Sequence, residues 1–335
     1  MERVISILAN VLVKYDYPIA IITLTSDAVE YEIDDRINIL HMSNSYNGGM
    51  FARINIIKQL YYSLKKIKPV VVIGFGEVFN PVSIITAKMN NLKVFISDRS
   101  NPLKKHRKRD EIARKLFYPL ADGMIAQTEL SKKKISDRRL NNNILILPNP
   151  LMEFKNFDIR PNKKAIITVG RLIPSKNQKE LIDIFNEINM NDWKLYIVGD
   201  GPLKKEITHY ISSLHLDGKV ILVGKTDNIE KWLGKGSIFA FVSLSEGFPN
   251  ALNEAMAFPL ASIAYDCPAG VRDLIEDKYN GLLIPLGNHT EYRKKLKELM
   301  DSEDLRKKLM QNSITNRVKY DKNIISRKLL NFITE

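Results

Sequence analysis

The feature that most constrains this chain is a regular alternation of short apolar runs with longer amphipathic segments. The runs are rich in β-branched residues and predict strands, whereas apolar residues recur at helical spacing between them, as at Leu181, Phe185 and Ile188. The runs span residues 19–24, 70–73, 94–96, 124–126, 144–147, 165–169, 195–198, 220–223, 238–242, 261–265 and 282–284. Continuous apolar strands separated by helices are typical of parallel sheets covered on both faces. The sequence therefore predicts an α/β, doubly wound architecture.

The alternation is interrupted once, near the middle of the chain. Leu147-Pro148-Asn149-Pro150 ends the first block, residues 151–164 are irregular and polar, and a new strand is predicted from Ala165. We therefore expect two Rossmann-like domains, residues 1–155 and 156–318, with a ligand site in the cleft between them. Residues 319–335 are expected to form a C-terminal helix that packs back on the first domain.

Composition narrows the function classes. The 335 residues include a single cysteine, which excludes an internal disulfide framework and a four-cysteine zinc site and favours a reducing cytoplasm. No apolar run approaches the ~18 residues of a membrane span. The formal net charge is +13, and residues 1–150 hold 23 basic against 14 acidic residues. This imbalance favours an anionic partner, either nucleic acid, a membrane surface or a phosphorylated substrate, although it could also serve solubility alone.

The most specific motif follows the run 238–242. Its sequence is Glu246-Gly-Phe-Pro-Asn-Ala-Leu-Asn-Glu254, in which Gly247 and Pro249 predict a tight turn and Ala251 begins a helix. One carboxylate then lies in the loop and the other about one turn into the helix, with free backbone N–H groups between them. This arrangement suits sugar hydroxyls, although two solvated glutamates flanking a helix are an equally simple interpretation.

A second motif follows the run 165–169. Gly170 permits a close turn, and Ser175-x-x-Gln178 matches a capping box that predicts a helix from about Lys176. Arg171 and Lys176 would then lie beside the positive end of that helix, which suits a diphosphate. Taken alone, an ordinary capped helix with surface cations is the simpler interpretation.

The remaining signals are weaker. Gly199 and Gly201 predict a turn after one strand, and Gly224-Lys225 ends another and could present backbone groups to a base. Cys267 has no histidine near it in sequence, so it is interpreted as a small loop residue rather than a nucleophile. The five histidines lack metal-ligand spacing and no Asp-x-Asp pair is present, so no metal and no separate cofactor are expected.

Two basic clusters lie in the first half of the chain. The first includes Lys104, Lys105, Arg107, Lys108 and Arg109 together with Arg114 and Lys115, and it precedes Phe117 and Tyr118. The second comprises Lys132, Lys133, Lys134, Arg138 and Arg139. Solvated helix faces explain both clusters, but a surface for anionic lipid headgroups or for a lipid diphosphate explains them equally well. Nucleic acid is not expected, because no recognition motif accompanies the charge.

Together these motifs resemble glycosyltransferase family 4, whose members have the GT-B fold. The resemblance covers nearly the whole chain, and its specific part lies in the second half. It is carried by Gly170-Arg171-Leu172 with Lys176, Val198-Gly-Asp-Gly-Pro202, Gly224, Glu246-x7-Glu254, Pro268-x-Gly270 and Asn280-Gly281, and by Ala121-Asp122-Gly123 and Pro148-Asn149-Pro150 in the first half.

The resemblance implies a retaining transferase that uses a nucleotide-activated sugar without a metal. Glu254 would bind the ribose, and Glu246 would hold the donor sugar together with the segment Gly247-Phe248-Pro249-Asn250. Arg171 and Lys176 would neutralise the departing diphosphate, where growing charge is best stabilised by fixed cations. Gly224 and Lys225 would flank the base, and Gly199 and Gly201 would allow a close backbone approach, as would Gly170.

Two departures from the family pattern are expected to matter. Ser97-Asp98-Arg99-Ser100 stands where many relatives have a histidine, so Asp98 and Arg99 are candidate catalytic residues, with a structural salt bridge as the alternative. The family also begins with a strand and a glycine-rich loop, whereas this chain opens at Met1-Glu2-Arg3-Val4, which resembles the end of that loop. A missing first strand would indicate a misassigned start or a truncated, impaired product.

The expected function is transfer of a hexose or N-acetylhexosamine from a UDP-sugar to a growing surface glycan, such as a capsule or O-antigen. The basic excess favours a polyprenyl-diphosphate-linked acceptor and a peripheral location at the inner face of the cell membrane, with Lys104 to Arg109 on the acceptor side. Two alternatives remain. One is a nucleotide-sugar-binding protein without turnover, and the other is a basic nucleic-acid-binding α/β protein.

Overall fold

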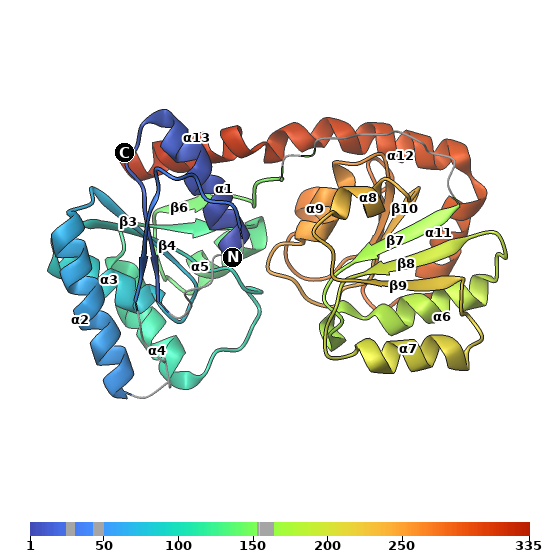
Figure 1. The fold of residues 1–335 in the computed structure, drawn as a ribbon, viewed down its shortest axis with the longest axis horizontal. Coiled ribbons are helices and arrows are strands. Elements are labelled where there is room, and N and C mark those ends of the chain that lie inside the picture. Colours follow the sequence, from blue (N-terminus) through green and yellow to red (C-terminus); the bar gives the residue numbers. More distant parts are fainter. Residues whose placement is uncertain (25–30, 43–49, 153, 155–163) are drawn as a thin grey trace. The chain divides into compact units, whose positions relative to one another are not determined.

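A computed structural model of the chain describes all residues except 25–30, 43–49, 153 and 155–163. The chain forms two compact units (Figure 1). The first comprises Met1–Pro150 together with Tyr320–Glu335, and the second comprises Leu151–Lys319. The last helix, α13 (Lys322–Thr334), is therefore part of the first unit, and both ends of the chain lie there.

The first unit contains a four-stranded parallel sheet in the order β3-β4-β5-β6. Helices α1 and α13 cover one face, where Val4, Leu8, Ile325 and Leu329 pack against Phe95. Helices α3 and α5 and the short 3-10 turn η2 cover the other face. The elements are β3 (Val71–Phe75), β4 (Lys93–Ser97), β5 (Gly123–Ala126), β6 (Ile144–Ile146), α1 (Glu2–Leu12), α3 (Asn80–Met89), α4 (Lys108–Phe117), η2 (Tyr118–Leu120) and α5 (Glu129–Asp137).

A separate two-stranded parallel sheet pairs β1 (Ala20–Thr23) with β2 (Asn38–His41). Helix α1, followed by η1 (Val13–Tyr15), packs against this sheet as well, with Ala9 and Val13 in contact with Ile37. Helix α2 (Met50–Ile67) contributes Leu60 and Leu64 to a cluster that includes apolar residues of both β1 and β3. The two sheets are thus held between the same helices.

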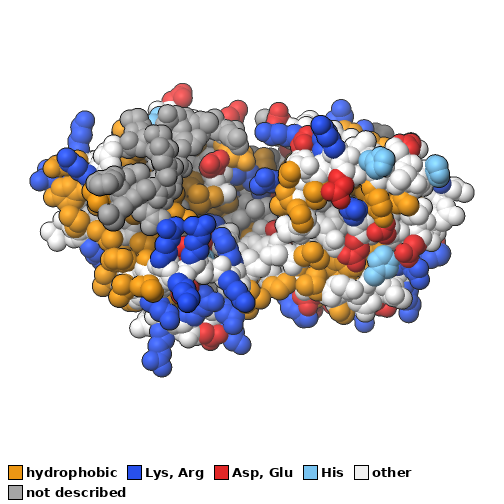
Figure 2. All heavy atoms as spheres, turned by 90° about the horizontal axis from the view of Figure 1, so that it is seen from below, with side chains coloured by type: hydrophobic (Ala, Val, Ile, Leu, Met, Phe, Trp, Pro, Cys, Tyr) orange, Lys and Arg blue, Asp and Glu red, His pale blue; other side chains and the backbone are white. Residues whose placement is uncertain are grey.

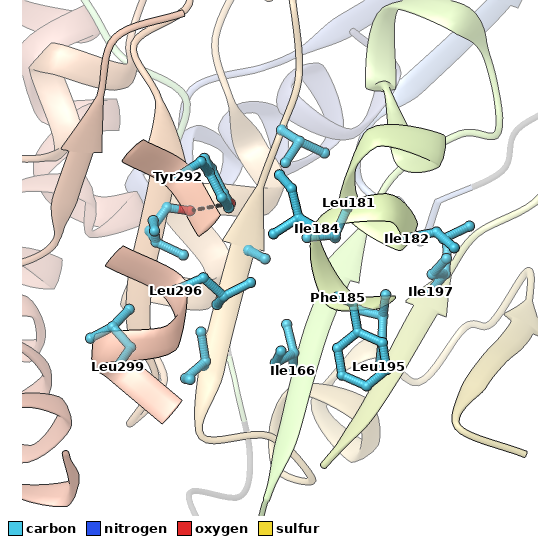
Figure 3. Close-up of a cluster of buried hydrophobic side chains, with 14 of the residues drawn as sticks. Ile166, Leu181, Ile182, Ile184, Phe185, Leu195, Ile197, Tyr292, Leu296 and Leu299 are labelled. Carbon is cyan, nitrogen blue, oxygen red and sulfur yellow. Dashed lines mark hydrogen bonds between the residues drawn. The ribbon is translucent and has the colours of Figure 1, made fainter. Parts of the chain in front are cut away.

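The second unit contains a six-stranded parallel sheet in the order β12-β11-β10-β7-β8-β9. Figure 3 shows its core, in which Leu181 and Phe185 of one helix and Tyr292 and Leu296 of another cover the sheet around Ile166. The Tyr292 hydroxyl donates to the Ile263 carbonyl at 3.2 Å, so this buried polar group is satisfied. The strands are β7 (Ala165–Val169), β8 (Lys194–Val198), β9 (Val220–Gly224), β10 (Ile238–Phe241), β11 (Ala261–Tyr265) and β12 (Leu282–Ile284).

Helices lie on both sides of this sheet, with α6 and α7 on one side and α8 and α9 on the other (Figure 1). The helical segments are η3 (Pro174–Lys176), α6 (Gln178–Ile188), α7 (Lys204–Ser213), α8 (Ile229–Leu233), α9 (Asn250–Met256), α10 (Val271–Leu274), α11 (His289–Asp301), α12 (Glu303–Asn316) and η4 (Arg317–Tyr320). The doubly wound α/β class predicted from the sequence is confirmed, and each of the eleven apolar runs is a strand.

The strand order of the second unit creates a topological switch point. The chain runs outward from β7 through β8 to β9, then returns to the other side of β7 with β10 and continues to β11 and β12. The loops that follow β7 and β10 therefore leave neighbouring strands in opposite directions. Open α/β sheets bind ligands at such a point, beyond the carboxyl ends of the strands.

Candidate functional site

The two most specific sequence motifs meet at this switch point. Lys176, at the end of the loop after β7, forms an ion pair with Glu246, in the loop after β10. The Leu244 amide donates to the Ser175 carbonyl at 2.8 Å, which ties the two loops together through the backbone. The Lys176 ammonium also lies 5.8 Å from the centre of the Phe241 ring. A cation and a carboxylate 70 residues apart in sequence are thus held at one edge of the sheet.

The local conformation around Lys176 differs from the predicted capping box. Pro174 begins the 3-10 turn η3, and Asn177 adopts a left-handed conformation with φ of 55°, so α6 begins only at Gln178. The Gln178 amide donates to the Arg171 carbonyl at 2.9 Å instead of capping a helix. The helix predicted from about Lys176 is present and begins two residues later, whereas the predicted capping box is wrong, because a turn that starts at Pro174 precedes the helix. The consequence is that Lys176 reaches Glu246 from the turn, while the Arg171 side chain stays exposed.

The two glutamates of the second motif lie in different environments. Glu246 is in the loop and partly exposed, whereas Glu254 lies on α9, one turn after Asn250, with only 6% of its surface accessible. Phe248 and Pro249, between them, are buried and fix the path of the loop. The two glutamates, eight residues apart, therefore differ in exposure, one partly exposed in the loop and the other buried on the helix that follows it.

The glycines of the neighbouring loops pack against the backbone of the β7 loop. A Cβ on Gly199, whose φ is +142°, would lie 2.0 Å from the Gly170 carbonyl oxygen, and a Cβ on Gly201 would lie 2.5 Å from the Leu172 carbonyl oxygen. Gly224 has a φ of +85°, and a Cβ on it would meet no atom within 4 Å. Its carbonyl oxygen accepts a hydrogen bond from the Gly199 amide at 2.9 Å. Lys225 beside it is exposed. A close backbone approach therefore exists, but between loops, and contact of these glycines with a donor stays a prediction.

Cys267, in the loop after β11, is buried near the same edge. Burial raises the pKa of its thiol to about 12, and the nearby carboxylate of Glu246 acts in the same direction. A thiol with so high a pKa is almost entirely protonated at neutral pH, which is the opposite of what a nucleophile requires. Cys267 is therefore a packing residue of the loop.

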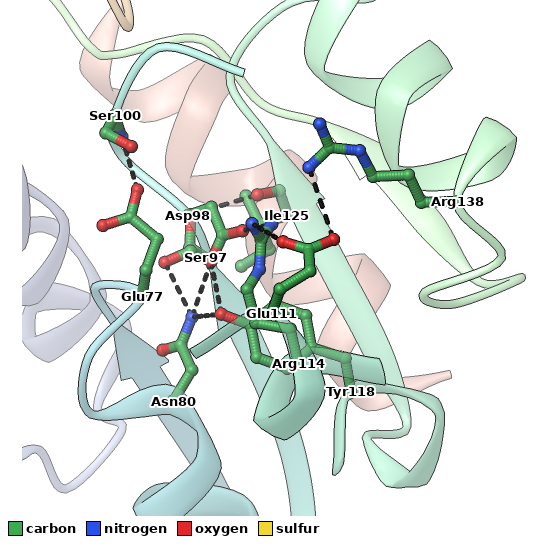
Figure 4. Close-up of polar contacts among 10 residues, drawn as sticks. All are labelled: Glu77, Asn80, Ser97, Asp98, Ser100, Glu111, Arg114, Tyr118, Ile125 and Arg138. Carbon is green, nitrogen blue, oxygen red and sulfur yellow. Dashed lines mark hydrogen bonds and ion pairs between the residues drawn. The ribbon is translucent and has the colours of Figure 1, made fainter. Parts of the chain in front are cut away.

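In the first unit, Asp98 belongs to a buried polar network (Figure 4). Its carboxylate accepts from Arg114 at 2.6 Å, from the Tyr118 hydroxyl at 2.8 Å and from the Asn80 amide at 2.9 Å. Burial raises the pKa of Asp98, and Arg114 opposes that shift. Arg114 is only 5% exposed and lies 3.7 Å from Glu111, which in turn faces Arg138 at 3.8 Å. This network joins the end of β4 to helices α3, α4 and α5.

Arg99, the next residue, is in a different environment. One guanidinium nitrogen donates to the Asn149 side-chain oxygen at 2.7 Å, and the group lies 5.0 Å from the Phe75 ring centre. Asn149 also accepts from Gln127 at 2.8 Å. Within the described part of the chain, the buried Nε and Nη2 of Arg99 have no hydrogen-bond partner and no carboxylate faces the group. Burial lowers its pKa to about 10, so the guanidinium remains charged at neutral pH.

The structure thus separates Asp98 from Arg99, which sequence reasoning had treated as one candidate pair. The salt bridge of Asp98 is formed with Arg114, a residue that the sequence placed in a surface cluster. Tyr118, which follows that cluster in sequence, is fully buried. Asn80 and Tyr118 were not predicted to contact Asp98, because they lie 18 and 20 residues from it, and no spacing rule joins them.

The other predicted residues of the first cluster do lie on the surface. Lys104, Lys105, Arg107, Lys108 and Arg109 are all exposed, in the loop before α4 and in its first turn. Among the described residues, no group of three His, Cys, Asp or Glu side chains could hold a metal ion. None of the described helices is long and apolar enough to cross a bilayer.

Comparison with known proteins gives a consistent result. Residues 152–315 match the family model described as glycosyl transferases group 1. An uncharacterized glycosyltransferase of Methanocaldococcus jannaschii is 33% identical over 281 residues, which cover 74% of this chain and 69% of that protein. An N-acetylgalactosamine-N,N'-diacetylbacillosaminyl-diphospho-undecaprenol 4-alpha-N-acetylgalactosaminyltransferase of Campylobacter jejuni is 28% identical over 99% of this chain and 95% of its own length.

The fold agrees with that of solved structures. The Anabaena protein HepE, crystallised with UDP and glucose, has a TM-score of 0.81 to this chain at 16% identity, over 100% of this chain and 95% of HepE. At this level of identity the likeness concerns the fold, which is GT-B. With the family match in sequence, the chain belongs to the group 1 glycosyltransferases.

Proposed function

We propose that this chain is a retaining glycosyltransferase that moves a hexose or an N-acetylhexosamine from a nucleotide sugar to a lipid-linked or polysaccharide acceptor. The observation that carries the proposal is the meeting of Lys176, Glu246 and the α9 segment with Glu254 at the switch point of the second unit. That edge supplies fixed positive charge from one loop and carboxylate acceptors from the next, which are the groups that a sugar diphosphate requires.

The chemistry is stabilisation of a leaving group. As the bond between the anomeric carbon and the diphosphate oxygen breaks, negative charge grows on the diphosphate, and Arg171 and Lys176 would stabilise it. The acceptor hydroxyl oxygen would form the new bond to the anomeric carbon from the same face, and its proton would pass to the departing diphosphate. Lys176 is held by Glu246 in the absence of substrate, so it would exchange part of that ion pair for the diphosphate. The freed Glu246 carboxylate would then accept hydrogen bonds from the donor sugar, and Glu254 from the ribose. We propose that these two cations neutralise the diphosphate in place of a metal ion.

The donor and the acceptor are inferred from the relatives. HepE was crystallised with UDP, and the Campylobacter jejuni relative acts by name on a diphospho-undecaprenol-linked sugar. We therefore propose UDP as the nucleotide and a polyprenyl-diphosphate-linked glycan as the acceptor, at the inner face of the cell membrane. The exposed cations from Lys104 to Arg109 would lie on the acceptor side, and Arg99 would face an anionic group, because its charge has no acidic partner in the described structure.

The experiment is a thermal-shift panel with UDP, GDP, several UDP-sugars and a short DNA duplex. A ligand at ~100 times its dissociation constant should stabilise the protein by roughly 2.7 kcal/mol. Glu254→Ala should abolish the UDP shift, whereas Glu276→Ala, an exposed glutamate of the same unit, should retain it. Loss of the UDP shift in both variants, or in neither, would contradict the assigned ribose contact.

Turnover separates this proposal from its main alternative, a nucleotide-sugar-binding protein without transferase activity. A UDP shift without sugar transfer to any polyprenyl-diphosphate acceptor would favour that alternative. A shift with DNA alone, with steep salt dependence, would favour the nucleic-acid-binding alternative that the net charge of +13 leaves open.

A further inference from the structure

Helix α4 carries a row of large apolar side chains that face away from the core. Ile112 is 58% exposed, Leu116 63% and Leu120, in the adjoining η2, 54%. Ile112 and Leu116 are spaced by four and so lie on one side of α4, and Leu120 continues the exposed apolar residues into the adjoining 3-10 turn. Leu103, in the loop just before the helix, is 44% exposed as well. A soluble protein gains nothing by presenting such a row to water, so the row indicates a contact surface.

Exposed cations border this row. At helical spacing, Lys108 and Lys115 fall on one side of Ile112 and Leu116, and Arg109 falls on the other. Lys104, Lys105 and Arg107 extend the positive charge through the preceding loop. Within the described part of the chain, the one acidic contact of these six cations is between Arg109 and Asp110, at 3.4 Å. Figure 2 shows Lys and Arg side chains gathered on the first unit, next to hydrophobic side chains.

The inner face of α4 explains why the row is held outward. Arg114 is buried in its ion pair with Asp98, and Tyr118 is fully buried with its hydroxyl on the same carboxylate. Rotating the helix to bury Leu116 would expose Tyr118 and break both contacts. The apolar row is therefore fixed in place by the network under it rather than displaced from the core.

We propose that this surface, defined by Leu103, Ile112, Leu116 and Leu120 and its six bordering cations, binds the surface of an anionic lipid bilayer, with α4 lying in the interface plane. An apolar row flanked by Lys and Arg is the pattern of a helix that inserts its side chains between headgroups while its cations contact lipid phosphates. The positive border favours a bilayer over an apolar protein surface, and the apolar centre favours it over nucleic acid. This inference concerns the first unit alone and rests on the membrane location proposed above, for which it names the contact surface; the vesicle test below does not involve the transfer reaction.

The test is sedimentation of the full chain with lipid vesicles at low and at high salt. Vesicles of phosphatidylcholine containing about one third phosphatidylglycerol should bind the protein, and vesicles of phosphatidylcholine alone should not. The variants Ile112→Ser/Leu116→Ser and Lys108→Gln/Lys115→Gln should each weaken binding by roughly tenfold or more, the first by losing insertion and the second by losing headgroup contacts. High salt should weaken binding of the wild-type chain.

Matched controls come from the second unit, where Lys205 and Lys308 are exposed lysines and Leu286 is an exposed leucine. Lys205→Gln/Lys308→Gln and Leu286→Ser should bind vesicles as the wild type does. A Leu116→Trp variant should show a blue-shifted emission with anionic vesicles only. Equal binding to both kinds of vesicle, no binding to either, or wild-type binding by the α4 variants would each overturn the proposal, as would retention on a DNA duplex in place of vesicles. Melting curves of the variants, with and without UDP, verify that the fold and the second unit are unchanged.

Discussion

The contact between Gly199 and Gly170 allows a quantitative test of how rigidly the candidate donor site is built. A Cβ at residue 199 would lie 2.0 Å from the Gly170 carbonyl oxygen and 2.8 Å from its carbonyl carbon, whereas real Cβ atoms do not approach other atoms closer than 3.0 Å. Gly199→Ala therefore requires a movement of about 1 Å in the backbone that leads to Arg171 and Lys176. Overpacking of this kind costs about 1–3 kcal/mol.

A second cost comes from the backbone conformation. The φ of +142° at Gly199 is strained for any residue with a side chain, which adds about 1–2 kcal/mol. Gly218→Ala is the matched control, because its φ of +79° carries similar strain, nothing lies within 4 Å of the new Cβ, and Gly218 has no proposed contact with the donor. Together the two costs should lower the free energy of unfolding by about 3.5 kcal/mol in Gly199→Ala, against about 1.5 kcal/mol in the control variant.

Scanning calorimetry measures both variants. For a unit of this size, 1 kcal/mol corresponds to about 2–4 °C, so we expect Tm to fall by roughly 10 °C in Gly199→Ala and by roughly 4 °C in Gly218→Ala. UDP binding should weaken more than tenfold in the first variant alone, because only there is the β7 loop displaced. If the two variants melt together, or if Gly199→Ala binds UDP normally, the loops are not held as rigidly as the contact indicates.

Three further predictions concern buried ionisable groups. Arg99→Met should leave thermal stability unchanged or raise it, because it removes a buried charge that has no acidic partner. It should nevertheless lower the rate of sugar transfer about a hundredfold or more, because a positioned positive charge is lost. Arg99→Lys should restore part of the transfer activity. Asp98→Asn should destabilise the chain by about 3 kcal/mol in urea unfolding, because the buried Arg114 guanidinium loses its close carboxylate partner and keeps only Glu111, 3.7 Å away. The pKa of the Cys267 thiol is raised from 9.0 to about 12, so at pH 8 the native protein should react with iodoacetamide about a thousandfold more slowly than the protein in urea. The rate in the native protein should rise tenfold per pH unit up to about pH 11. A native rate that levels off near pH 9 would contradict the burial of the thiol.

Sequence patterns predicted the strands well, because burial on both faces leaves a strong local signal. The exception is β2, where Asn38 and His41 are polar and exposed and only Ile39 and Leu40 remain apolar. Two apolar residues are too few to establish a period. The sheet that β2 joins has only two strands and is less covered, so the sequence there is not forced to be apolar.

The motifs of the second unit could be found in the sequence because each lies within one strand-to-helix connection. What could not be found was how they meet. The Lys176–Glu246 ion pair depends on the strand order that makes β7 and β10 neighbours, and the turn at Pro174 to Asn177 replaced a capping box that the residue types also fit. Local chemistry was predictable to the extent that it did not depend on tertiary contacts.

The first unit illustrates the opposite case. Asp98 and Arg99 follow β4 directly, and successive residues of an extended segment point to opposite sides, so neighbours in sequence enter different surroundings. The Asp98 side chain points toward α3 and α4, where it accepts hydrogen bonds from Asn80, Arg114 and Tyr118. The Arg99 side chain points toward Phe75 and Asn149. The Asp98-Arg99 sequence, which resembles an acid–arginine pair, therefore places its two side chains in two separate hydrogen-bond networks.

The Asp98 network also affects the proposed membrane surface. Because Asp98 holds Arg114 and Tyr118 on the inner side of α4, it fixes which side of that helix carries Ile112 and Leu116 outward. Loss of the Asp98 carboxylate should therefore weaken vesicle binding although the residue is far from any lipid, because the apolar row would no longer be held in one orientation. Substitution of Arg99 should leave vesicle binding unchanged, because Arg99 contacts neither α4 nor the network beneath it.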